Sequence, residues 1–261
     1  MKTIATLIIG ITLAAMGQIA HAREITFSGK QWTVRNSGTS TSGPGPNYWS
    51  DFTDNVWLDA NGYLHLKITH VGDKWYCPEV TTKDKFGLGE YQFWLIGRID
   101  DFDPHIAFGL FQFPTPDLGV SGSHEIDFEF SKWGGSSSVP NALYTVYPNV
   151  NPQGPIRVAG QDKWRFDLDN SNPNPWTTHR YTRTENSILF QSQYGHYNDA
   201  TNLFHSWTYN AATDTYTPTP GDVNHSLAAM PVHLNLWCFN GPPSNGQEVE
   251  IVVRAFKFTP L

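Results

Sequence analysis

The sequence predicts an all-β protein of the sandwich class, in which two sheets pack against each other. Short alternating or apolar runs recur along the chain, separated by clusters of Gly, Pro, Asn and Ser. This spacing is typical of sandwich strands joined by turns. The sequence has no internal repeat and no long segment with helical periodicity. A chain of 261 residues is of a size that one such domain can fill, with a sizeable core.

The first residues have the pattern of a secretory signal peptide. Met1-Lys2 is followed by an apolar stretch over residues 4–16 and by Ala20-His21-Ala22. A positive start, a short apolar region and a small-x-small cleavage site are the parts of such a peptide. The apolar stretch is shorter than the ~20 residues that a membrane span needs. We predict that residues 1–22 are removed, that residues 23–261 form one domain, and that the protein is secreted or periplasmic.

Turn signals and apolar runs place the strands in order. Residues 23–35 predict one or two strands, and residues 36–47, rich in Ser, Thr, Gly and Pro, a loop. Residues 56–68 predict a hairpin, because Asn61-Gly62 between two apolar runs is a strong turn signal. The same patterns predict further strands within residues 75–80, 86–94, 106–113, 123–130, 142–147, 176–181, 187–194, 204–209, 231–237 and 249–258. We expect Trp176 and Tyr181 to lie in the core.

The run over residues 123–130 contains three regularly spaced carboxylates. Glu125, Asp127 and Glu129 alternate with Ile, Phe and Phe. Strict alternation places the carboxylates on one face of a strand and the apolar residues on the other. Neighbouring like charges disfavour ionisation, so a row of this kind suggests that a polar group binds there.

Two such carboxyl groups are what glycoside hydrolysis needs. One acts as acid and base, the other as nucleophile, and retaining enzymes hold the two about 5–5.5 Å apart. Residues i and i+4 of a strand lie roughly 13 Å apart, so Glu125 and Glu129 must lean together on a concave sheet. Asp127 would then contact both and share a proton with them. An exposed edge strand and a Ca²⁺ site are the alternatives, although Ca²⁺ usually binds to flexible loops.

Glu125-x-Asp127-x-Glu129 resembles the active-site strand of glycoside hydrolase family 16. That family includes lichenases, laminarinases, agarases, carrageenases and plant xyloglucan enzymes. The unbulged motif is similar to that of lichenases and xyloglucan-active members. The resemblance implies a jelly-roll, concanavalin-like sandwich with a concave cleft. It also implies that Glu125 is the nucleophile, Asp127 its helper and Glu129 the acid/base.

Two other stretches resemble substrate-binding segments of the family. Residues 231–237 are similar to its Met-Asn-Leu-Trp strand, which implies that Asn235 and Trp237 face the cleft. Alternation agrees, since it places both residues on one face with His233. Cys77-Pro78-Glu79 resembles the Cys-Gly-Glu segment of lichenases, which implies a substrate contact for Glu79. A surface carboxylate at a strand edge is the alternative for Glu79.

Four aromatic or glycine positions complete the expected cleft. Gly109 stands where many family members place a Trp, with Phe111 on the same face of its strand. Trp133, just after the carboxylates, is either a sugar platform or a cap on the core. In relatives the strand over residues 142–147 places an Asn or Tyr beside the acid/base, and we select Tyr144 for this position.

Composition and net charge limit the classes of ligand that we expect the protein to bind. Aromatic residues make up 14% of the chain and charged residues 16%, which suits sugar recognition and also a large aromatic core. A net charge of −7 disfavours nucleic acids and acidic polymers and fits a neutral polysaccharide. We expect no nucleic-acid or membrane partner and a monomer. We also expect that no cofactor is required, while a structural Ca²⁺, as in some relatives, stays open.

The sequence contains two cysteines, Cys77 and Cys238. An even count in an exported protein favours a disulfide, which here would close a long loop. Such a bridge would stabilise the fold by several kcal/mol, of the order of 2–5. Two buried free thiols are the alternative.

Together these features predict a secreted, retaining endo-glycosidase that hydrolyses a β-linked polysaccharide, with β-glucan as the first candidate. A lectin-like sandwich without turnover is one alternative. A transglycosylase with the same catalytic residues is another.

Overall fold

The computed structural model describes residues 22–149, 158–172, 174–210 and 225–261. The predicted signal peptide lies outside these residues, except for its last position. In the described part of the chain, every regular element is a β-strand. These strands are β1 (Glu24–Phe27), β2 (Lys30–Val34), β3 (Tyr48–Trp49), β4 (Val56–Leu58), β5 (Leu64–Val71), β6 (Lys74–Cys77), β7 (Glu79–Thr82), β8 (Gly89–Ile96), β9 (Ile106–Gln112), β10 (Ile126–Ser131), β11 (Ala142–Val146), β12 (Gly160–Trp164), β13 (Trp176–Arg183), β14 (Ser187–Tyr194), β15 (Leu203–Asn210), β16 (Val232–Cys238) and β17 (Val249–Pro260). The described residues therefore contain no helix that could cross a membrane.

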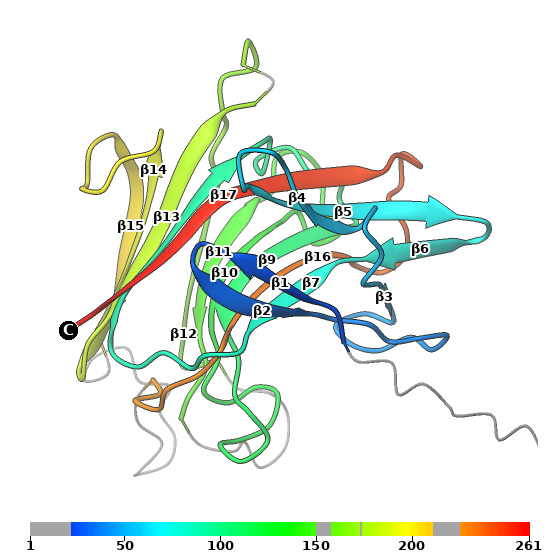
Figure 1. Ribbon diagram of the computed structural model, residues 1–261. Coiled ribbons are helices and arrows are strands. Elements are labelled where there is room, and N and C mark those ends of the chain that lie inside the picture. Colours follow the sequence, from blue (N-terminus) through cyan, green and yellow to red (C-terminus); the bar gives the residue numbers. More distant parts are fainter. Residues whose placement is uncertain (1–21, 150–157, 173, 211–224) are drawn as a thin grey trace, which may run out of the picture.

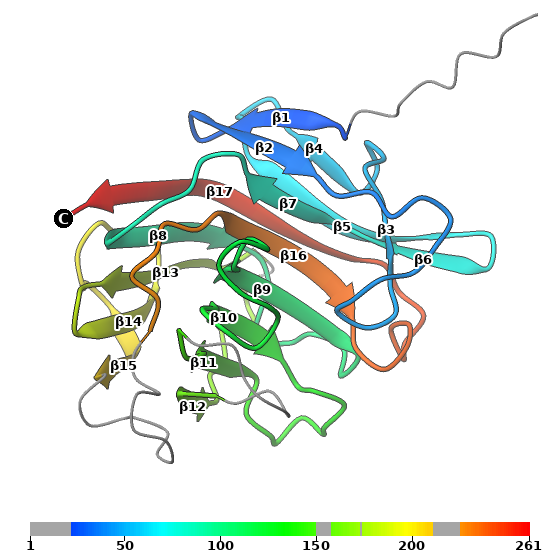
Figure 2. The ribbon, with the colours of Figure 1, turned by 90° about the horizontal axis from the view of Figure 1, so that it is seen from below.

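The strands form two sheets that pack as a sandwich (Figure 1). The eight-stranded sheet has the order β1-β2-β7-β16-β9-β10-β11-β12, and the nine-stranded sheet has the order β15-β14-β13-β8-β17-β5-β6-β3 with β4 beside β5. Figure 2 shows β7, β16, β9, β10, β11 and β12 of the eight-stranded sheet following one another along an arc. The predicted fold class, an all-β jelly-roll sandwich with a curved sheet, is confirmed.

The aromatic side chains of the core fix the orientation of β10. The ring of Phe128 lies between the sheets, with its centroid 6.3, 5.8 and 5.4 Å from those of Phe93, Tyr181 and Phe190. These three partners belong to β8, β13 and β14 of the nine-stranded sheet. Because the apolar face of β10 points into the sandwich, its carboxylates point out of the opposite face.

The predicted hairpin forms between β4 and β5, with Leu58 paired to Leu64. Gly62 has a φ of 77°, in the left-handed region that favours glycine. The Asp59 carboxylate accepts hydrogen bonds from the backbone N–H groups of Asn61 at 2.8 Å and Tyr63 at 2.9 Å. The turn therefore closes through its own side chain and backbone, as the sequence predicts.

Trp176, predicted in the core, lies instead at the surface. It is the first residue of β13, and its side chain is 52% exposed, whereas Tyr181 on the same strand is buried as expected. Trp176 and Tyr181 are an odd number of residues apart on one strand, so their side chains leave opposite faces of the sheet. The prediction for Trp176 was therefore wrong.

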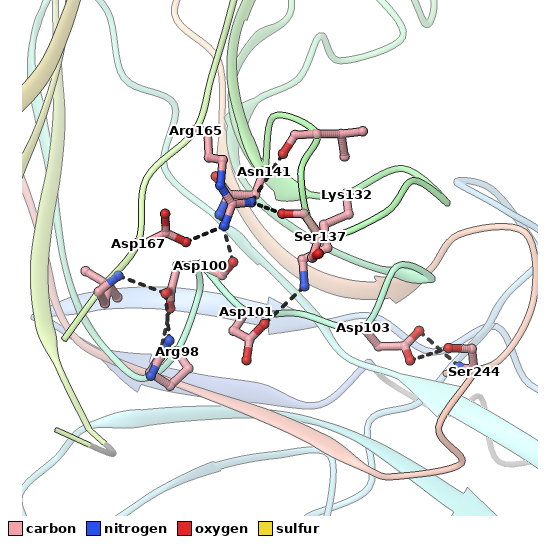
Figure 3. A network of polar contacts seen from close by, with 12 residues as sticks. Arg98, Asp100, Asp101, Asp103, Lys132, Ser137, Asn141, Arg165, Asp167 and Ser244 are labelled. Atoms are coloured by element: carbon pink, nitrogen blue, oxygen red, sulfur yellow. Dashed lines mark hydrogen bonds and ion pairs between the residues drawn. The ribbon is translucent and has the colours of Figure 1, made fainter. Parts of the chain in front are cut away.

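A polar network ties three loops together at one end of the sandwich (Figure 3). Asp100 is buried and accepts two hydrogen bonds of 2.8 Å from the Arg98 guanidinium. Its Oδ2 also accepts the backbone N–H of Leu168 at 2.8 Å. The Asn141 amide donates to the carbonyl oxygens of Asp100 and Phe166, both at 2.8 Å. The segment after β12 is therefore held to the loop after β8 and to the start of β11.

Candidate active site

A groove of about 550 Å³ lies on the outward face of the eight-stranded sheet. It is lined by residues from β7, β9, β10 and β16 and from neighbouring loops: Arg35, Gly43, Pro44, Glu79, Gly109, Phe111, Phe113, Ser121, Glu125, Asp127, Glu129, His233, Asn235 and Trp237. The three predicted carboxylates therefore line a single groove.

Strand register brings the groove residues together in rows. Glu129 pairs with Gly109, Gly109 with Asn235, and Asn235 with Glu79. The next row contains Asp127, Phe111 and His233. Side chains of paired residues leave the same face of an antiparallel sheet, so residues far apart in the sequence meet here.

Burial and mutual repulsion raise the pKa values of the three carboxyl groups in the groove. Burial, and then the charge of Glu129, raises the pKa of Glu125 to about 8, while a hydrogen bond with Asp127 acts in the opposite direction. Burial raises the pKa of Glu129 to about 7. Burial, followed by the charges of both glutamates, raises the pKa of Asp127 well above its usual range. The titrations of the three groups are therefore coupled, so that the charge of one favours the protonated form of its neighbours.

Two buried oxygens in the groove have no hydrogen-bond partner within the described residues. They are Oδ1 of Asp127 and Oδ1 of Asn235, whose side chains are 2% and 3% exposed. Buried acceptors are usually paired, so each is suited to a donor from a ligand. Gly109 keeps the space beside Asn235 open, because a Cβ there would lie 2.7 Å from Asn235 Oδ1.

Glu79 lies in the groove as an ion-paired carboxylate. Its Oε2 lies 2.8 Å from Arg35 Nη1, and its Oε1 lies 3.3 Å from His233 Nδ1. Burial alone would raise the pKa of Glu79, but the hydrogen bond and charge of His233 and the charge of Arg35 lower it below its usual value. The alternative interpretation of Glu79, as a surface carboxylate at a strand edge, was wrong, since its side chain is buried.

Arg35 is a groove residue that the sequence reasoning missed. It directly follows β2, and besides Glu79 its guanidinium contacts the carbonyl of Gly43 at 2.7 Å and the ring of Trp49 at 4.2 Å. A lone arginine before a polar loop carries no pattern of its own. Only the pairing of β2 with β7 brings it beside Glu79.

The predicted aromatic positions divide into two groups. Phe111 lines the groove and stacks on His233 at 4.9 Å, and Trp237 lines it while only 7% exposed. Trp133 is not among the lining residues. Its indole packs edge-on against Trp237 at 5.9 Å and Phe239 at 5.1 Å. Trp133 therefore packs against the core and supports Trp237, while its role as a sugar platform stays a prediction.

Tyr144 was the wrong tyrosine for the position beside the carboxylates. It is buried between the sheets, where its hydroxyl donates to Ser192 Oγ at 2.7 Å. Tyr147 is an odd number of residues from Tyr144, so alternation directs its side chain to the opposite face. Its backbone N–H donates to the carbonyl of Glu125 at 2.9 Å. Burial, together with the charges of the three carboxylates, raises the pKa of Tyr147. Counting alternate residues from Thr145, the partner of Asp127, identifies Tyr147.

The predicted disulfide is absent. Cys77 and Cys238 are buried free thiols whose sulfur atoms lie 3.9 Å apart. The Cys77 thiol donates to Asn47 Oδ1 at 3.4 Å. The two cysteines are neighbours in the fold, as a disulfide requires, but the free-thiol alternative describes the structure.

In the part of the chain that the structure describes, no group of three or more His, Cys, Asp and Glu residues is arranged to hold a metal ion. The carboxylates of the groove are therefore not arranged as a Ca²⁺ site. A structural Ca²⁺ remains a prediction from the resemblance.

Comparison with known proteins bears on the fold. No protein-family model and no curated protein sequence matches the chain. Among solved structures, the β-glucanase of Bacillus licheniformis aligns with a TM-score of 0.61 and 17% identity, over 94% of this chain and 100% of that one. A β-1,3-1,4-glucanase (lichenase) from a mouse hindgut metagenome aligns with 0.56 and 17%, over 88% and 93%. A family 16 glycosyl hydrolase of Mycobacterium smegmatis aligns with 0.56 and 17%, over 87% and 91%.

The chain has a glycoside hydrolase family 16 fold. The resemblance that the carboxylate motif indicated is thus confirmed for the architecture. A Mycobacterium tuberculosis protein described as a pseudo β-1,3-glucanase shares this fold, with a TM-score of 0.59 and 20% identity over 88% of this chain and 91% of that one. The fold by itself does not decide function, which depends on the residues that line the groove.

Proposed function

We propose that the protein is an exported, retaining endo-glycosidase that cleaves a β-linked polysaccharide, with β-glucan as the first candidate. The observation that carries the proposal is the electrostatic coupling of Glu125, Asp127 and Glu129 within one open groove. Coupled carboxyl groups with separated roles are the requirement of double-displacement glycoside hydrolysis.

In the proposed mechanism Glu129 donates a proton to the leaving glycosidic oxygen. The Glu125 carboxylate attacks the anomeric carbon and forms a glycosyl-enzyme ester. Water then attacks that carbon while Glu129 takes its proton, and the sugar is released with its original configuration. Asp127, which hydrogen-bonds to Glu125, orients the nucleophile.

Charge coupling gives Glu129 both of its roles. The two raised pKa values belong to the coupled pair, and the reaction uses the arrangement in which Glu129 carries the shared proton and Glu125 is ionised. In that arrangement the negative charge of Glu125 favours the protonated form of Glu129. When Glu125 becomes a neutral ester, that repulsion disappears and the pKa of Glu129 falls. Glu129 can then act as a base in the second step, as the reaction sequence requires.

The groove suits a neutral sugar chain. Asn235 and Asp127 each present a buried acceptor without a partner in the described residues, and Trp237 contributes part of a ring face. Sugar hydroxyls donate to such acceptors, and pyranose C–H faces pack on aromatic rings. The net charge of −7 disfavours uronic or sulfated polymers.

The test separates the two glutamates by their roles. Reducing ends released from a panel of β-glucans should fall by roughly 10²–10⁴-fold in Glu125→Gln and in Glu129→Gln. On an aryl glycoside whose leaving group needs no proton, Glu129→Gln should keep its first step, whereas Glu125→Gln should not. Undiminished release in Glu125→Gln, or a product of inverted configuration, would contradict the proposal.

A non-catalytic, sugar-binding role is the second candidate, favoured by the neighbour described as a pseudo β-1,3-glucanase. Tight binding to the same β-glucans without products would support it. If activity is found, the sizes of the products separate hydrolysis from transglycosylation, since only sugar acceptors that compete with water give longer oligomers.

A further inference from the structure

A second hollow, of about 700 Å³, lies apart from the carboxylate groove. It is lined by Asp167, Leu168, Asp169, Trp176 and Tyr194, among other residues. The two sets of lining residues have no member in common. Trp176 begins β13 and Tyr194 ends β14, both in the nine-stranded sheet, whereas the groove lies on the eight-stranded sheet.

The indole of Trp176 is supported by the imidazole of His196 and by the Arg254 guanidinium, which lies 5.7 Å from the ring centroid, and it is half exposed to solvent. It stacks on the imidazole of His196, with centroids 4.7 Å apart and planes 8° apart, yet remains 52% exposed. His196 Nε2 donates to the carbonyl of Leu95 at 2.9 Å, and its Nδ1 accepts from Arg254 at 3.0 Å. A supported ring loses little conformational freedom when a ligand packs on it.

Other residues that line the hollow are also held in place. Leu168 is tied to the buried Asp100 through its backbone N–H. Asp167 pairs with Arg165 (Figure 3). The Asp167 side chain nevertheless remains 69% exposed. Tyr194 is 40% exposed and packs against Phe204, with centroids 4.4 Å apart. Exposed carboxylates therefore lie beside two exposed aromatic rings that are supported from behind.

Exposed carboxylates beside supported aromatic rings favour a sugar over acidic and apolar ligands. Rigid ring faces pack against the C–H faces of pyranoses, and carboxylate oxygens accept hydroxyl hydrogens strongly. The carboxylates and the net charge of −7 repel acidic polymers. An apolar partner would leave the carboxylates of Asp167 and Asp169 facing a surface that offers them no donors.

We propose that this hollow is a second, non-catalytic site that binds a segment of a neutral β-linked polysaccharide. The identity of the ligand rests on the proposed function. A polymer held here raises the effective concentration of further segments at the groove, without any new contact at the carboxylates. The second site should therefore affect long or insoluble substrates and leave short soluble ones unaffected.

The test compares Trp176→Ala with Phe52→Ala, a matched control that is 54% exposed and lines neither hollow. Both changes are placed in a Glu125→Gln background, and binding to insoluble β-1,3-glucan particles is measured by depletion. Trp176→Ala should bind roughly tenfold more weakly, and Phe52→Ala should bind as the background does. With all three carboxylates intact, Trp176→Ala should hydrolyse a short soluble β-glucan oligosaccharide at an unchanged rate.

Equal binding by the two variants would overturn the second site, and hydrolysis of the oligosaccharide would leave the proposed function standing. Binding that depends on Trp176, in a protein that hydrolyses none of the β-glucans, would overturn the proposed function and support the second site. Should Trp176→Ala fail to fold, Tyr194→Ala is expected to show the same weakening. Unchanged particle binding by folded Tyr194→Ala would then contradict the proposal.

Discussion

The raised pKa values of Glu125, Asp127 and Glu129 mean that ionising these groups in the groove lowers the stability of the fold. Each carboxyl loses hydration, and the glutamates and Asp127 repel one another when ionised. Active sites often reduce stability in this way, because the groups that react are not the groups that pack best. Alternation along the strand predicts which residues share the groove, but their pKa values depend on burial.

The stability of the protein should therefore depend on pH in a direction set by these groups. With folded-state pKa values of about 8 for Glu125 and 7 for Glu129, the folded protein holds more protons than the unfolded chain between about pH 4.5 and 8. Stability should fall as the pH rises through that window. Glu125→Gln removes one charge, so it should raise the melting temperature by roughly 3–8 °C at pH 8 and have little effect at pH 4.5.

Calorimetry or circular dichroism at the two pH values measures this effect. Glu185→Gln, an exposed carboxylate outside the groove, is the control and should melt as the unmodified protein does at both. A melting temperature that Glu125→Gln changes equally at both pH values would contradict the assignment of raised pKa values.

Gly109 should be intolerant of even a methyl group. A Cβ there would lie 2.7 Å from Asn235 Oδ1 and 3.3 Å from Phe111 Cδ1, so the Asn235 side chain must move. Displacing a group that positions substrate commonly costs roughly 10²-fold in activity, and we expect a loss of that order in kcat/KM for Gly109→Ala. Gly87→Ala should be unaffected, because a Cβ added at Gly87 would meet no atom within 4 Å. Equal kcat/KM for the two variants on one β-glucan would refute this role.

At the scale of elements, β10 serves both the core and the groove. Ile126, Phe128 and Phe130 are almost completely buried, while the alternating carboxylates open into the groove. The period of two in the sequence is sufficient to predict this division. Applied to β13, the same period shows that Trp176 and Tyr181 cannot both face the core, and the burial of Tyr181 decides which of the two does.

Phe128 anchors the carboxylate strand, so its truncation should affect the whole fold. The ring is buried and packs against aromatic partners on three strands of the opposite sheet. Phe128→Ala should lower the free energy of unfolding by roughly 3–5 kcal/mol through lost contacts and a cavity. Denaturant unfolding measures the change, and the exposed Phe52→Ala should lie within about 0.5 kcal/mol of the unmodified protein. A cost below about 1 kcal/mol for Phe128→Ala would be inconsistent with this anchoring role.

At the scale of the molecule, the two sheets bring together residues that no local pattern connects. Cys77 lies at the end of β6 and Cys238 at the end of β16, and the fold places their sulfur atoms 3.9 Å apart. An even cysteine count favours a bridge in an exported protein, but the buried thiols of the structure give a different expectation.

A thiol-reactive dye should label neither cysteine in the native protein and both after unfolding in guanidinium. Burial denies the reagent access, and raises the pKa of the Cys77 thiol so that little reactive thiolate forms. Cys77→Ser should show one thiol after unfolding. If the unfolded, unreduced protein shows no thiol at all, the two cysteines are bridged and the expectation is wrong.

Features that depend on local period and turn chemistry could be predicted from the amino-acid order alone. These are the all-β class, the hairpin at Asn61-Gly62, and the shared face of Glu125, Asp127 and Glu129. The resemblance to family 16 correctly added Glu79, Asn235 and Trp237 to the groove.

Which distant residues complete the site depends on how the strands pair in three dimensions. The pairing of β2 with β7 places Arg35 on Glu79, and the register of β11 places Tyr147, not Tyr144, beside the carboxylates. Packing of the folded chain also makes Trp176 a surface ring and Trp133 a support for Trp237. No local pattern contains this information, because a shift of one residue in pairing moves a side chain to the other face of a sheet, and long-range packing sets that pairing.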